Sequence, residues 1–301
     1  MENHGNHISV CICTYKRPAF LRRLLEDLSN QETGGHFTYS TVICDNDHLR
    51  SAEPFVSDFA ATSNISVIYC VEPRRGISLA RNKAIENAPG NYIALIDDDE
   101  FPARNWLHEL FAACEKYKVD GVLGPVKPSF GDDVPQWIVK GRFYHKPSHE
   151  TGFVLAPRNT RTSNVLLRDR VLQNMSSPFR PEFRACEDLD FFTRAIERGY
   201  VFVWCDEAVV HEEIPSSRWT RSYLLKKALL RGSSAALMPS TDAFKVTKSF
   251  IAVLAYGFTL PFVALLGQHR FMDRLVRLCD HLGMVLAILG FNPIKEPYVT
   301  G

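Results

Sequence analysis

Short apolar runs alternate with segments of helical period over residues 8–126. This alternation predicts parallel strands joined by crossover helices, and therefore an α/β fold. The apolar runs are continuous rather than alternating with polar positions, which is typical of strands that are covered on both faces of a sheet. We expect five such strands, at residues 8–14, 41–44, 65–71, 92–96 and 121–126.

A helix is predicted directly after the first strand. Pro18 is a favoured first-turn residue, and the apolar positions that follow it fall on one helical face. Those positions are Phe20, Leu21, Leu24, Leu25 and Leu28. Later in the chain, the patterns predict a strand at 163–167, a helix at 187–198, a strand at 200–205 and a helix at 218–237.

The alternation of strand and helix patterns ends over residues 127–161, where Pro, Gly and charged residues are mixed with scattered aromatic residues. Such a composition predicts a long loop region that faces the substrate. Trp137, Phe143 and Tyr144 lie in this region, and their rings either stack on a ligand or pack in a core.

The last part of the chain changes character. Residues 250–267 contain no charged side chain, and 18 residues are a borderline length for a membrane span. Gly257, Thr259 and Pro261 interrupt the stretch, and a second apolar run, 282–291, is too short to cross a bilayer. Basic residues flank the stretch on both sides: Lys245, Lys248, Arg270, Arg274 and Arg277. This pattern favours a helix pair that lies in, or dips into, the cytoplasmic interface, and a buried core helix is the alternative.

Composition narrows the class of protein. The 301 residues are 46% hydrophobic, which suits one large or two small domains. A charged fraction of 23% with a net charge of +1 excludes a disordered acidic tail and predicts no bulk electrostatic partner. Eight cysteines without a C-x-x-C pair indicate buried, reduced thiols. The polar start at residues 1–7 lacks the features of a signal peptide, so we expect a cytoplasmic catalytic part.

Four consecutive acids, Asp97 to Glu100, directly follow the predicted strand at 92–96. Ligands bind at the carboxyl ends of strands in parallel sheets. Neighbouring carboxylates repel one another and raise their pKa values unless a cation neutralises them, and Mg²⁺ or Mn²⁺ bound with phosphate oxygens would do so. The alternative is an acidic amino end of a helix at 106–113. The preceding strand favours a metal–phosphate site.

Five motifs occur in order along the chain. They are Ser-Val-Cys-Ile-Cys-Thr-Tyr-Lys-Arg-Pro at 9–18, Val-Ile-Cys-Asp-Asn at 42–46, Gly-Ile-Ser-Leu-Ala-Arg-Asn at 76–82, Asp-Asp-Asp at 97–99 with Pro102, and Glu187-Asp188. In these motifs and their order, the chain resembles glycosyltransferases of family 2, and most closely bacterial enzymes of succinoglycan-type exopolysaccharide biosynthesis. The resemblance covers roughly residues 8–238.

The resemblance implies a GT-A fold, with a mostly parallel central sheet flanked by helices and a C-terminal apolar helical extension. We expect a catalytic domain at 1–240, with a nucleotide-sugar half at about 1–126 and an acceptor half at about 127–240. The remaining residues, 241–301, would form the apolar extension that associates with a membrane.

The resemblance also implies residues that bind the sugar donor and a metal ion. The implied nucleotide-sugar-binding residues are Thr14, Tyr15, Arg17, Asp45, Arg81, Asp97 and Asp98, and the implied ligands of Mn²⁺ or Mg²⁺ are Asp97, Asp99 and His211. Within this set, Asp45 would meet the base and Arg81 the diphosphate or nucleoside. Simpler roles exist, because Thr14 could cap a helix, Asp45 could form an Asx turn and Arg81 could be solvated.

Glu187 and Asp188 open the predicted helix at 187–198. Acids at that position also stabilise a helix dipole, which is the ordinary explanation for an isolated pair. The resemblance implies that Asp188 is the base that takes the proton of the acceptor hydroxyl, with Glu187 as its supporting neighbour. His211 follows an apolar run at 208–210, and a packed or surface histidine is the alternative to a metal ligand there.

The function implied by the resemblance is an inverting, metal-dependent transfer of a hexose, with glucose from UDP-glucose as the expected donor. The acceptor would be a polyprenyl-linked oligosaccharide or another glycan in exopolysaccharide or cell-surface polysaccharide biosynthesis. We expect the protein at the cytoplasmic face of the inner membrane, peripheral or held by its C-terminal segment, without a nucleic-acid partner. The polar, basic stretch at 158–164 is expected to contact the acceptor or its lipid diphosphate.

Three other classes of protein share some of these features. A dinucleotide-dependent dehydrogenase shares the alternation of strands and helices, but residues 14–18 are Thr-Tyr-Lys-Arg-Pro and not a G-x-G-x-x-G fingerprint. A phosphatase with an aspartyl nucleophile would carry its acid after the first strand and not after the fourth. A membrane-docked nucleotide-sugar-binding protein without transferase activity is the remaining alternative, and its function would not depend on Asp188.

Overall fold

The computed structural model describes residues 5–292 and residue 294. The first four residues of the polar start, residue 293 and the end of the predicted extension at 295–301 lie outside the described residues. The chain divides into two compact units. Unit 1 comprises residues 1–128, 146–181 and 187–213, and unit 2 comprises residues 129–145, 182–186 and 214–301.

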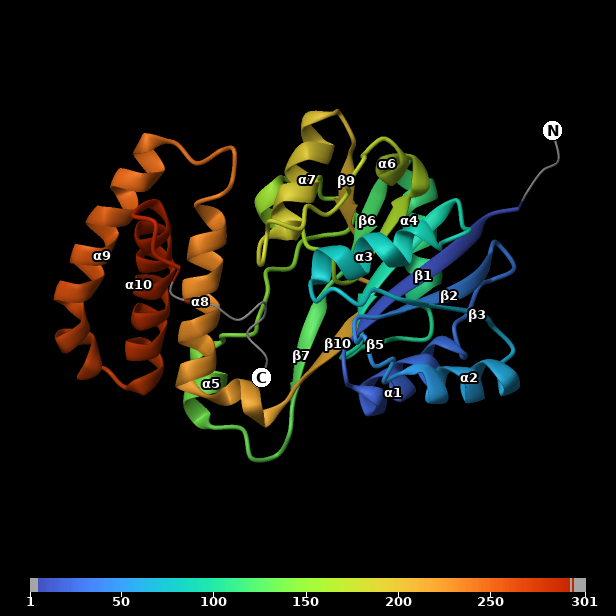
Figure 1. Ribbon diagram of the computed structural model, residues 1–301, viewed down its shortest axis with the longest axis horizontal. Helices are drawn as coiled ribbons and strands as arrows, with labels where there is room; N and C mark the ends of the chain where they lie inside the picture. The colour runs from blue at the N-terminus through green and yellow to red at the C-terminus, as the bar shows by residue number, and fades with distance from the viewer. Residues whose placement is uncertain (1–4, 293, 295–301) are drawn as a thin grey trace. The chain divides into compact units, whose positions relative to one another are not determined.

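Unit 1 is built around a seven-stranded sheet with the order β3-β2-β1-β4-β8-β6-β9 (Figure 1). Its strands are β1 (His7–Thr14), β2 (Thr38–Asp45), β3 (Ser66–Val71), β4 (Tyr92–Asp97), β6 (Gly121–Leu123), β8 (Val165–Arg168) and β9 (Phe202–Trp204). All neighbouring pairs are parallel except those of β8, which runs antiparallel to both β4 and β6. The prediction of a mostly parallel sheet is therefore confirmed.

Helices cover both faces of this sheet. The helices of unit 1 are α1 (Pro18–Leu28), α2 (Glu53–Thr62), α3 (Ile77–Glu86), α4 (Trp106–Tyr117), α6 (Asp169–Gln173) and α7 (Glu187–Glu197). On β1, Ile8 and Ile12 belong to a core cluster with residues of α1, α2 and α4. Cys11, on the other face, belongs to a second cluster with residues of α3 and α7. Burial on both faces explains why β1 is apolar at consecutive positions.

The predicted strand at 121–126 is confirmed only over 121–123, because the chain leaves the sheet at Gly124. β6 ends at Leu123, and β7 (Val126–Phe130) joins a second sheet with the order β5-β10-β7, which includes β5 (Glu100–Pro102) and β10 (Val210–Ile214). Pro125 has no backbone N–H for the ladder. The side-chain Nδ2 of Asn164 donates to the carbonyl oxygens of Pro125 and Ala208, at 2.9 and 2.8 Å, and so fixes the break.

The long loop predicted over 127–161 is also wrong. This region contains β7, the helix α5 (Gln136–Gly141) and a short 3₁₀ turn, Pro157–Asn159. In unit 2, Trp137, Phe143 and Tyr144 pack in a core cluster with Ile214 and Tyr223, so the aromatic rings belong to a core. A short helix and a five-residue strand leave too weak a periodicity to be recognised in a Pro- and Gly-rich sequence.

Three long helices dominate unit 2: α8 (Arg221–Ala235), α9 (Ala243–Ala264) and α10 (Gln268–Ile288). α10 packs against both α8 and α9 (Figure 1). α8 and α10 approach closely at two glycines, because a Cβ on Gly232 would lie 1.9 Å from the Asp280 carbonyl oxygen and one on Gly283 would lie 2.3 Å from that of Leu229. α8 therefore groups with α9 and α10, although we expected the boundary of the catalytic domain at residue 240.

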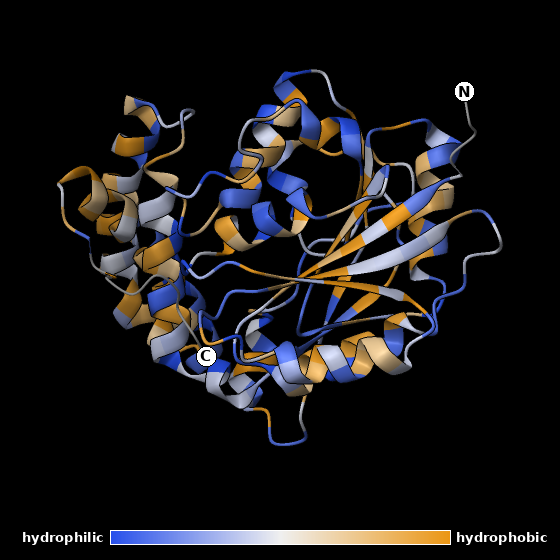
Figure 2. Ribbon diagram, turned by 45° about the vertical axis from the view of Figure 1, so that its right-hand side comes forward, coloured by the Kyte–Doolittle hydropathy of each residue, from blue (hydrophilic) through white to orange (hydrophobic). Residues whose placement is uncertain are grey.

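Hydrophobic colour covers much of the unit 2 helices in Figure 2, and α9 carries large apolar side chains that are exposed. Among the described residues it is the one helix that is long and apolar enough to cross a membrane, and only 6% of its apolar window is buried. The alternative of a buried core helix is contradicted by this exposure.

Candidate active site

The carboxyl ends of three neighbouring strands bring polar residues to one edge of the large sheet. Thr14 ends β1, Asp45 ends β2 and Asp97 ends β4. Thr14 lies opposite Asp45 in the register of β1 and β2, and Cys13 lies opposite Asp97 in the register of β1 and β4. This edge is the place where ligands bind in open parallel sheets.

Asp98 and Asp99, just beyond β4, are buried and share one arginine. The Arg17 guanidinium donates from Nη1 to Asp98 Oδ1 and to Asp99 Oδ2, at 3.1 Å each, and Thr14 Oγ1 donates to Asp98 Oδ2 at 2.8 Å. Burial, followed by repulsion from Asp99, raises the pKa of Asp98 to about 7 in spite of these contacts. The loop after β1 therefore neutralises the acid run only in part.

Arg81 joins the end of β4 to the start of α7. Its Nη2 donates to Asp97 Oδ1 at 3.1 Å and its Nη1 donates to Glu187 Oε1 at 2.6 Å. Burial disfavours the charged guanidinium, but the attraction of Asp97 and Glu187 is stronger and raises the pKa of Arg81. Residues that are 106 positions apart in the sequence thus form one ion-paired group.

The position of Arg81 follows from how α3 is anchored. Asn46 donates from Nδ2 to the carbonyl oxygens of Glu72 and Arg74, and its Oδ1 accepts from the N–H of Gly76, which precedes α3. Ala80 is fully buried against the sheet. These contacts give the motifs at 42–46 and 76–82 a shared structural role in placing Arg81.

Asp188 lies at the amino end of α7 and is partly buried. Its Oδ1 accepts the N–H of Leu189 at 2.7 Å. Burial, followed by repulsion from Glu187, raises the pKa of Asp188 to about 6. A carboxylate of this pKa is ionised at neutral pH and can still accept a proton during a reaction, as a general base must.

The amino end of α7 is itself fixed by ion pairs. Asp190 is buried and pairs with Arg180, from the loop before the helix, and with Arg194, one turn later. Phe191 is fully buried and packs against the ring of Phe179 from the same loop. This support limits the freedom of Asp188.

Asp45 is fully buried, and its carboxylate is used within the protein. Oδ1 accepts the N–H of Asp47 at 3.0 Å, and Oδ2 accepts the N–H of Ala52 at 2.8 Å and the hydroxyl of Tyr69 at 3.0 Å. The first of these bonds is the Asx turn that the sequence allowed. A contact of Asp45 with a nucleotide base stays a prediction.

Tyr15 lies close to two cations. The Nζ of Lys16 is 5.3 Å from the centre of its ring, and the Arg75 guanidinium carbon is 4.4 Å from it. Such cation–π contacts orient the ring at the sheet edge next to Thr14. The predicted role of Tyr15 in binding the sugar donor is not tested by this geometry.

The predicted metal ligands are not assembled as a set. Asp97 and Asp99 lie at the end of β4, whereas the side chain of His211 is exposed on β10, where its backbone pairs with Phe101. Within residues 5–292 and 294, no three His, Cys, Asp or Glu residues are grouped in a way that could hold a metal ion.

The donor set at the end of β4 nevertheless suits a hard divalent cation. Arg17 and Arg81 together contact four carboxylates, those of Asp97, Asp98, Asp99 and Glu187. Carboxylate oxygens are the ligands that Mg²⁺ and Mn²⁺ prefer. Because four carboxylates face only two arginines here, the residues present fit such an ion.

Two features of the site were not predicted. Glu100, the fourth acid of the run, is buried, and its Oε2 accepts the backbone N–H of Asp97 at 3.1 Å. Burial, then repulsion from Asp97, raises its pKa well above the usual range. The guanidinium of Arg161 has an Nη1 that is buried without a hydrogen-bond partner among the described residues, and it interacts electrostatically with Glu100 and Asp188.

The sequence held a partial signal for each of these residues. Glu100 continues the acid run, but only the structure shows that its carboxylate turns back to the strand. Arg161 belongs to the basic stretch at 158–164, and its place near the proposed base depends on contacts with Trp204 and Pro147.

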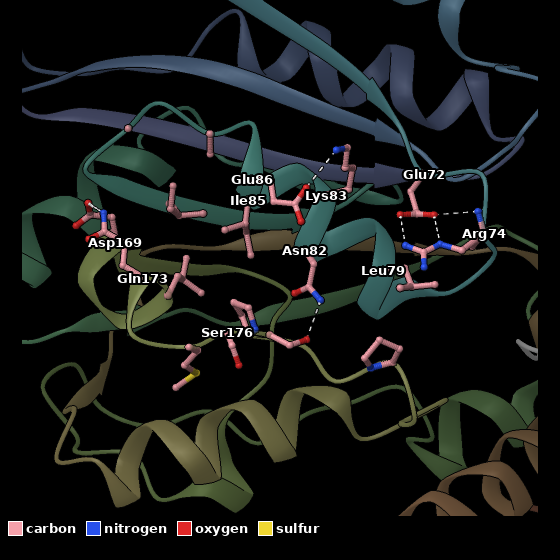
Figure 3. A pocket seen from close by; sticks show the side chains of 18 residues that line it. Glu72, Arg74, Leu79, Asn82, Lys83, Ile85, Glu86, Asp169, Gln173 and Ser176 are labelled. Atoms are coloured by element: carbon pink, nitrogen blue, oxygen red, sulfur yellow. Dashed lines mark hydrogen bonds and ion pairs between the residues drawn. The ribbon is translucent and has the colours of Figure 1, made fainter.

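A pocket of about 460 Å³ lies between α3 and residues 169–181 (Figure 3). Asn82 and Lys83 of α3 line it, and Asn82 Nδ2 donates to the Phe179 carbonyl oxygen at 2.7 Å. Arg81, on the same helix, is not among its lining residues. None of the predicted donor-binding, metal-binding or catalytic residues lines this pocket.

Comparison with known proteins gives consistent results. A family model described as "Glycosyl transferase family 2" matches residues 9–172, which is more than half of the chain. The chain is 29% identical to the "Succinoglycan biosynthesis protein ExoM" of Rhizobium meliloti (strain 1021) over an alignment of 309 residues, which covers 98% of this chain and 97% of that protein.

Solved structures share the fold. The mannosyltransferase PcManGT from Pyrobaculum calidifontis, solved with GDP-Man and Mn²⁺, has a TM-score of 0.65 and 15% identity, with 97% of this chain and 89% of that chain covered. TarS 1–349 of S. aureus, solved with UDP, has a TM-score of 0.54 and 15% identity, with 93% and 90% covered. At these identities the likeness concerns the fold.

The family match and the structural neighbours agree with each other on the class of protein. They confirm the GT-A fold and the family that the sequence predicted. The chain belongs to glycosyl transferase family 2.

Proposed function

We propose that this chain is an inverting glycosyltransferase that moves a hexose, first of all glucose from UDP-glucose, onto a polyprenyl-linked oligosaccharide or another glycan acceptor. Exopolysaccharide or cell-surface polysaccharide biosynthesis is the proposed setting, because the relative in Rhizobium meliloti aligns over nearly the whole chain. The observation that carries the proposal is Arg81, which joins Asp97 on the predicted donor side to Glu187, the neighbour of the proposed base Asp188.

The proposed reaction is a single displacement. The acceptor hydroxyl gives its proton to Asp188 as its oxygen forms a bond to the anomeric carbon, while the bond from that carbon to the diphosphate oxygen breaks. The nucleoside diphosphate leaves with the bonding electron pair, and the anomeric configuration inverts. General base catalysis contributes about 10²–10⁴-fold to such a rate, and orientation of the two substrates adds to it.

A divalent cation, Mn²⁺ or Mg²⁺, belongs to the proposal. Asp97 and Asp99 would hold it, with His211 as the proposed third ligand. When bound, the ion would neutralise charge on the departing diphosphate. Arg17, which contacts both Asp98 and Asp99, would then orient the acid run around the ion.

The proposed acceptor and location also follow from the apolar helix. α9 is exposed in unit 2, so we place the protein at the cytoplasmic face of the inner membrane, where a polyprenyl-linked acceptor is found. The basic stretch at 158–164, including Arg158 and Arg161, is proposed to contact the acceptor or its lipid diphosphate.

A panel of nucleotide sugars tests the function and the cation together. We expect release of nucleoside diphosphate from one sugar donor in the presence of Mn²⁺ or Mg²⁺ and membrane lipid extract, with loss of at least about tenfold in rate on addition of EDTA. Release is measured by a coupled diphosphate assay, and heat-treated protein is the control. Nucleotide-sugar binding without release would contradict the proposal and favour a binding protein, whereas release that is unchanged in EDTA would contradict the cation.

The rate is expected to fall in acid. The base must be ionised to accept a proton, and the pKa of Asp188 is raised to about 6. Activity is therefore expected to be full above about pH 7 and to fall about tenfold per pH unit below pH 6. The measurement is kcat as a function of pH with saturating substrates. A rate that stays constant down to pH 5 would contradict the assignment of the base, provided that circular dichroism shows folded protein throughout.

A further inference from the structure

One face of α9 forms an exposed apolar stripe. It consists of Phe244, Ile251, Leu254, Phe258, Phe262 and Leu265, which recur every three, four or seven residues and therefore lie on one side of the helix. The six side chains are between 61% and 87% exposed. Soluble monomers rarely leave so many large apolar side chains together in water.

The opposite face of α9 is already occupied by α10. The ring nitrogen Nδ1 of His281 lies 3.0 Å from Ser249 Oγ, and its ring lies 5.7 Å from that of Tyr256. The Arg274 guanidinium carbon lies 5.1 Å from the centre of the Tyr256 ring. The inner face of α9 therefore packs on α10 and makes polar contacts there, while its outer face is left with exposed apolar side chains.

Charge at the two ends of the apolar stripe favours an anionic lipid surface. Residues 243–267 contain no Asp or Glu, and Asp242 just before them caps α9 by accepting the N–H of Lys245. Lys245 and Lys248 are exposed near the start of α9, and Arg270 is exposed just after its end. Lipid headgroups with negative charge attract basic residues that flank an apolar face. A second copy of the stripe would instead bring basic ends against basic ends, which argues against self-association.

The packing of unit 2 argues against a helix that crosses the bilayer. α9 has 22 residues, or a length of about 33 Å, which would be sufficient to span. Its partner α10, however, carries Asp273, Arg277 and Asp280 along the same stretch, and Asp280 pairs with Arg231 of α8. A crossing by α9 with α10 attached would carry these charges into hydrocarbon, where charged side chains are expensive.

We propose that α9 lies flat in the boundary between headgroups and acyl chains of an anionic membrane. The apolar stripe enters the acyl region, and Lys245, Lys248 and Arg270 contact lipid phosphates. The inference rests on unit 2 and does not require the proposed sugar transfer, because the vesicle experiments contain no substrate.

Flotation with vesicles tests the docking surface. The full chain is expected to float with phosphatidylethanolamine–phosphatidylglycerol vesicles and to bind pure phosphatidylcholine vesicles more weakly. The double variant Leu254→Glu/Phe258→Glu should bind the anionic vesicles at least about 100-fold more weakly, because two apolar anchors are lost and two negative charges are gained. Its thermal melting should match that of the wild type, since both side chains face outward.

Leu49→Glu is the matched control, because Leu49 is a similarly exposed leucine, at 69%, on unit 1. It should bind vesicles as the wild type does. The proposal is overturned if the double variant binds like the wild type or if the wild type does not bind anionic vesicles. It is also overturned if the wild type is a stable dimer and the only effect of the double substitution is to dissociate that dimer.

Depth measurements separate a flat helix from a crossing one. Phe244→Trp, Phe258→Trp and Leu265→Trp are compared for quenching by lipids brominated at different positions, after subtraction of the wild-type signal. A flat α9 predicts the same shallow depth at all three positions. A deep middle position with shallow ends would show a spanning helix and overturn the proposed orientation.

Discussion

Asp188→Asn is expected to lower the rate of sugar transfer by about 10²–10⁴-fold while donor binding stays close to that of the wild type. The amide cannot accept the proton of the acceptor hydroxyl, but it keeps the size of the side chain and an oxygen for the N–H of Leu189. The measurement pairs single-turnover transfer, which reports the chemical step, with a titration of the nucleotide sugar, which reports binding.

Glu197→Gln is the control for this variant, since Glu197 is an exposed acid at the other end of the same helix. It should transfer sugar at the wild-type rate. A loss of donor affinity in Asp188→Asn that accounts for the whole loss of rate would show that Asp188 binds the donor and is not the base.

The same substitution is expected to stabilise the fold at neutral pH. The pKa of Asp188 is raised to about 6, so its contribution to stability is complete below about pH 4 and is lost as the pH rises through 6. Removing the ionisable group should therefore raise the free energy of unfolding by roughly 1–3 kcal/mol at pH 8. Urea denaturation at pH 8 measures this gain, which is the reverse of what a purely structural carboxylate would give.

The sheet could be predicted because its signal is local. Ile8, Val10 and Ile12 pack on one face of β1 and Cys11 packs on the other, so the strand is apolar at consecutive positions from Val10 to Cys13. The same holds for β4 between Ile93 and Ile96. Where a strand consists of consecutive apolar residues, the sequence alone is enough to predict it.

The break after β6 could not be predicted in this way. The direction of the chain at Pro125 depends on Asn164 and Ala208, which are 39 and 83 positions later in the sequence. Nothing in the sequence near Gly124 indicates that the side chain of Asn164 will hydrogen-bond the backbone where the sheet pairing ends. The direction of β8 could not be predicted either, since an apolar run predicts a strand but does not indicate whether it is parallel or antiparallel to its neighbours.

The sequence indicates which charged residues lie at the candidate site but not how they pair. The acid run after β4 and the pair at the start of α7 are visible in the sequence. That Arg17 contacts Asp98 and Asp99, and that Arg81 contacts both Asp97 and Glu187, depends on where α3, β4 and α7 meet. Residue types indicate which chemistry is available, and only the fold decides which charges meet.

Arg81→Met is expected to lower the free energy of unfolding by about 3 kcal/mol and to abolish sugar transfer. Arg81 is buried and pairs with Glu187, whose side chain is only 12% exposed, so its removal leaves a carboxylate unpaired in a poorly solvated place. Asp97, at 39% exposed, adds less because water can hydrate it. Urea denaturation at pH 7.5 measures the loss, with Arg198→Met, a change at an exposed arginine at the end of α7, as the control.

A double-mutant cycle decides whether the ion pairs are the cause. Glu187→Gln removes the buried charge that Arg81→Met leaves unpaired, so the double variant should recover at least about 1 kcal/mol of the lost stability. Arg81→Lys should be intermediate, because one ammonium group cannot hold two carboxylates as the planar guanidinium does. Strictly additive losses in the cycle would show that Arg81 stabilises the fold through its packing against Phe179 and not by joining β4 to α7.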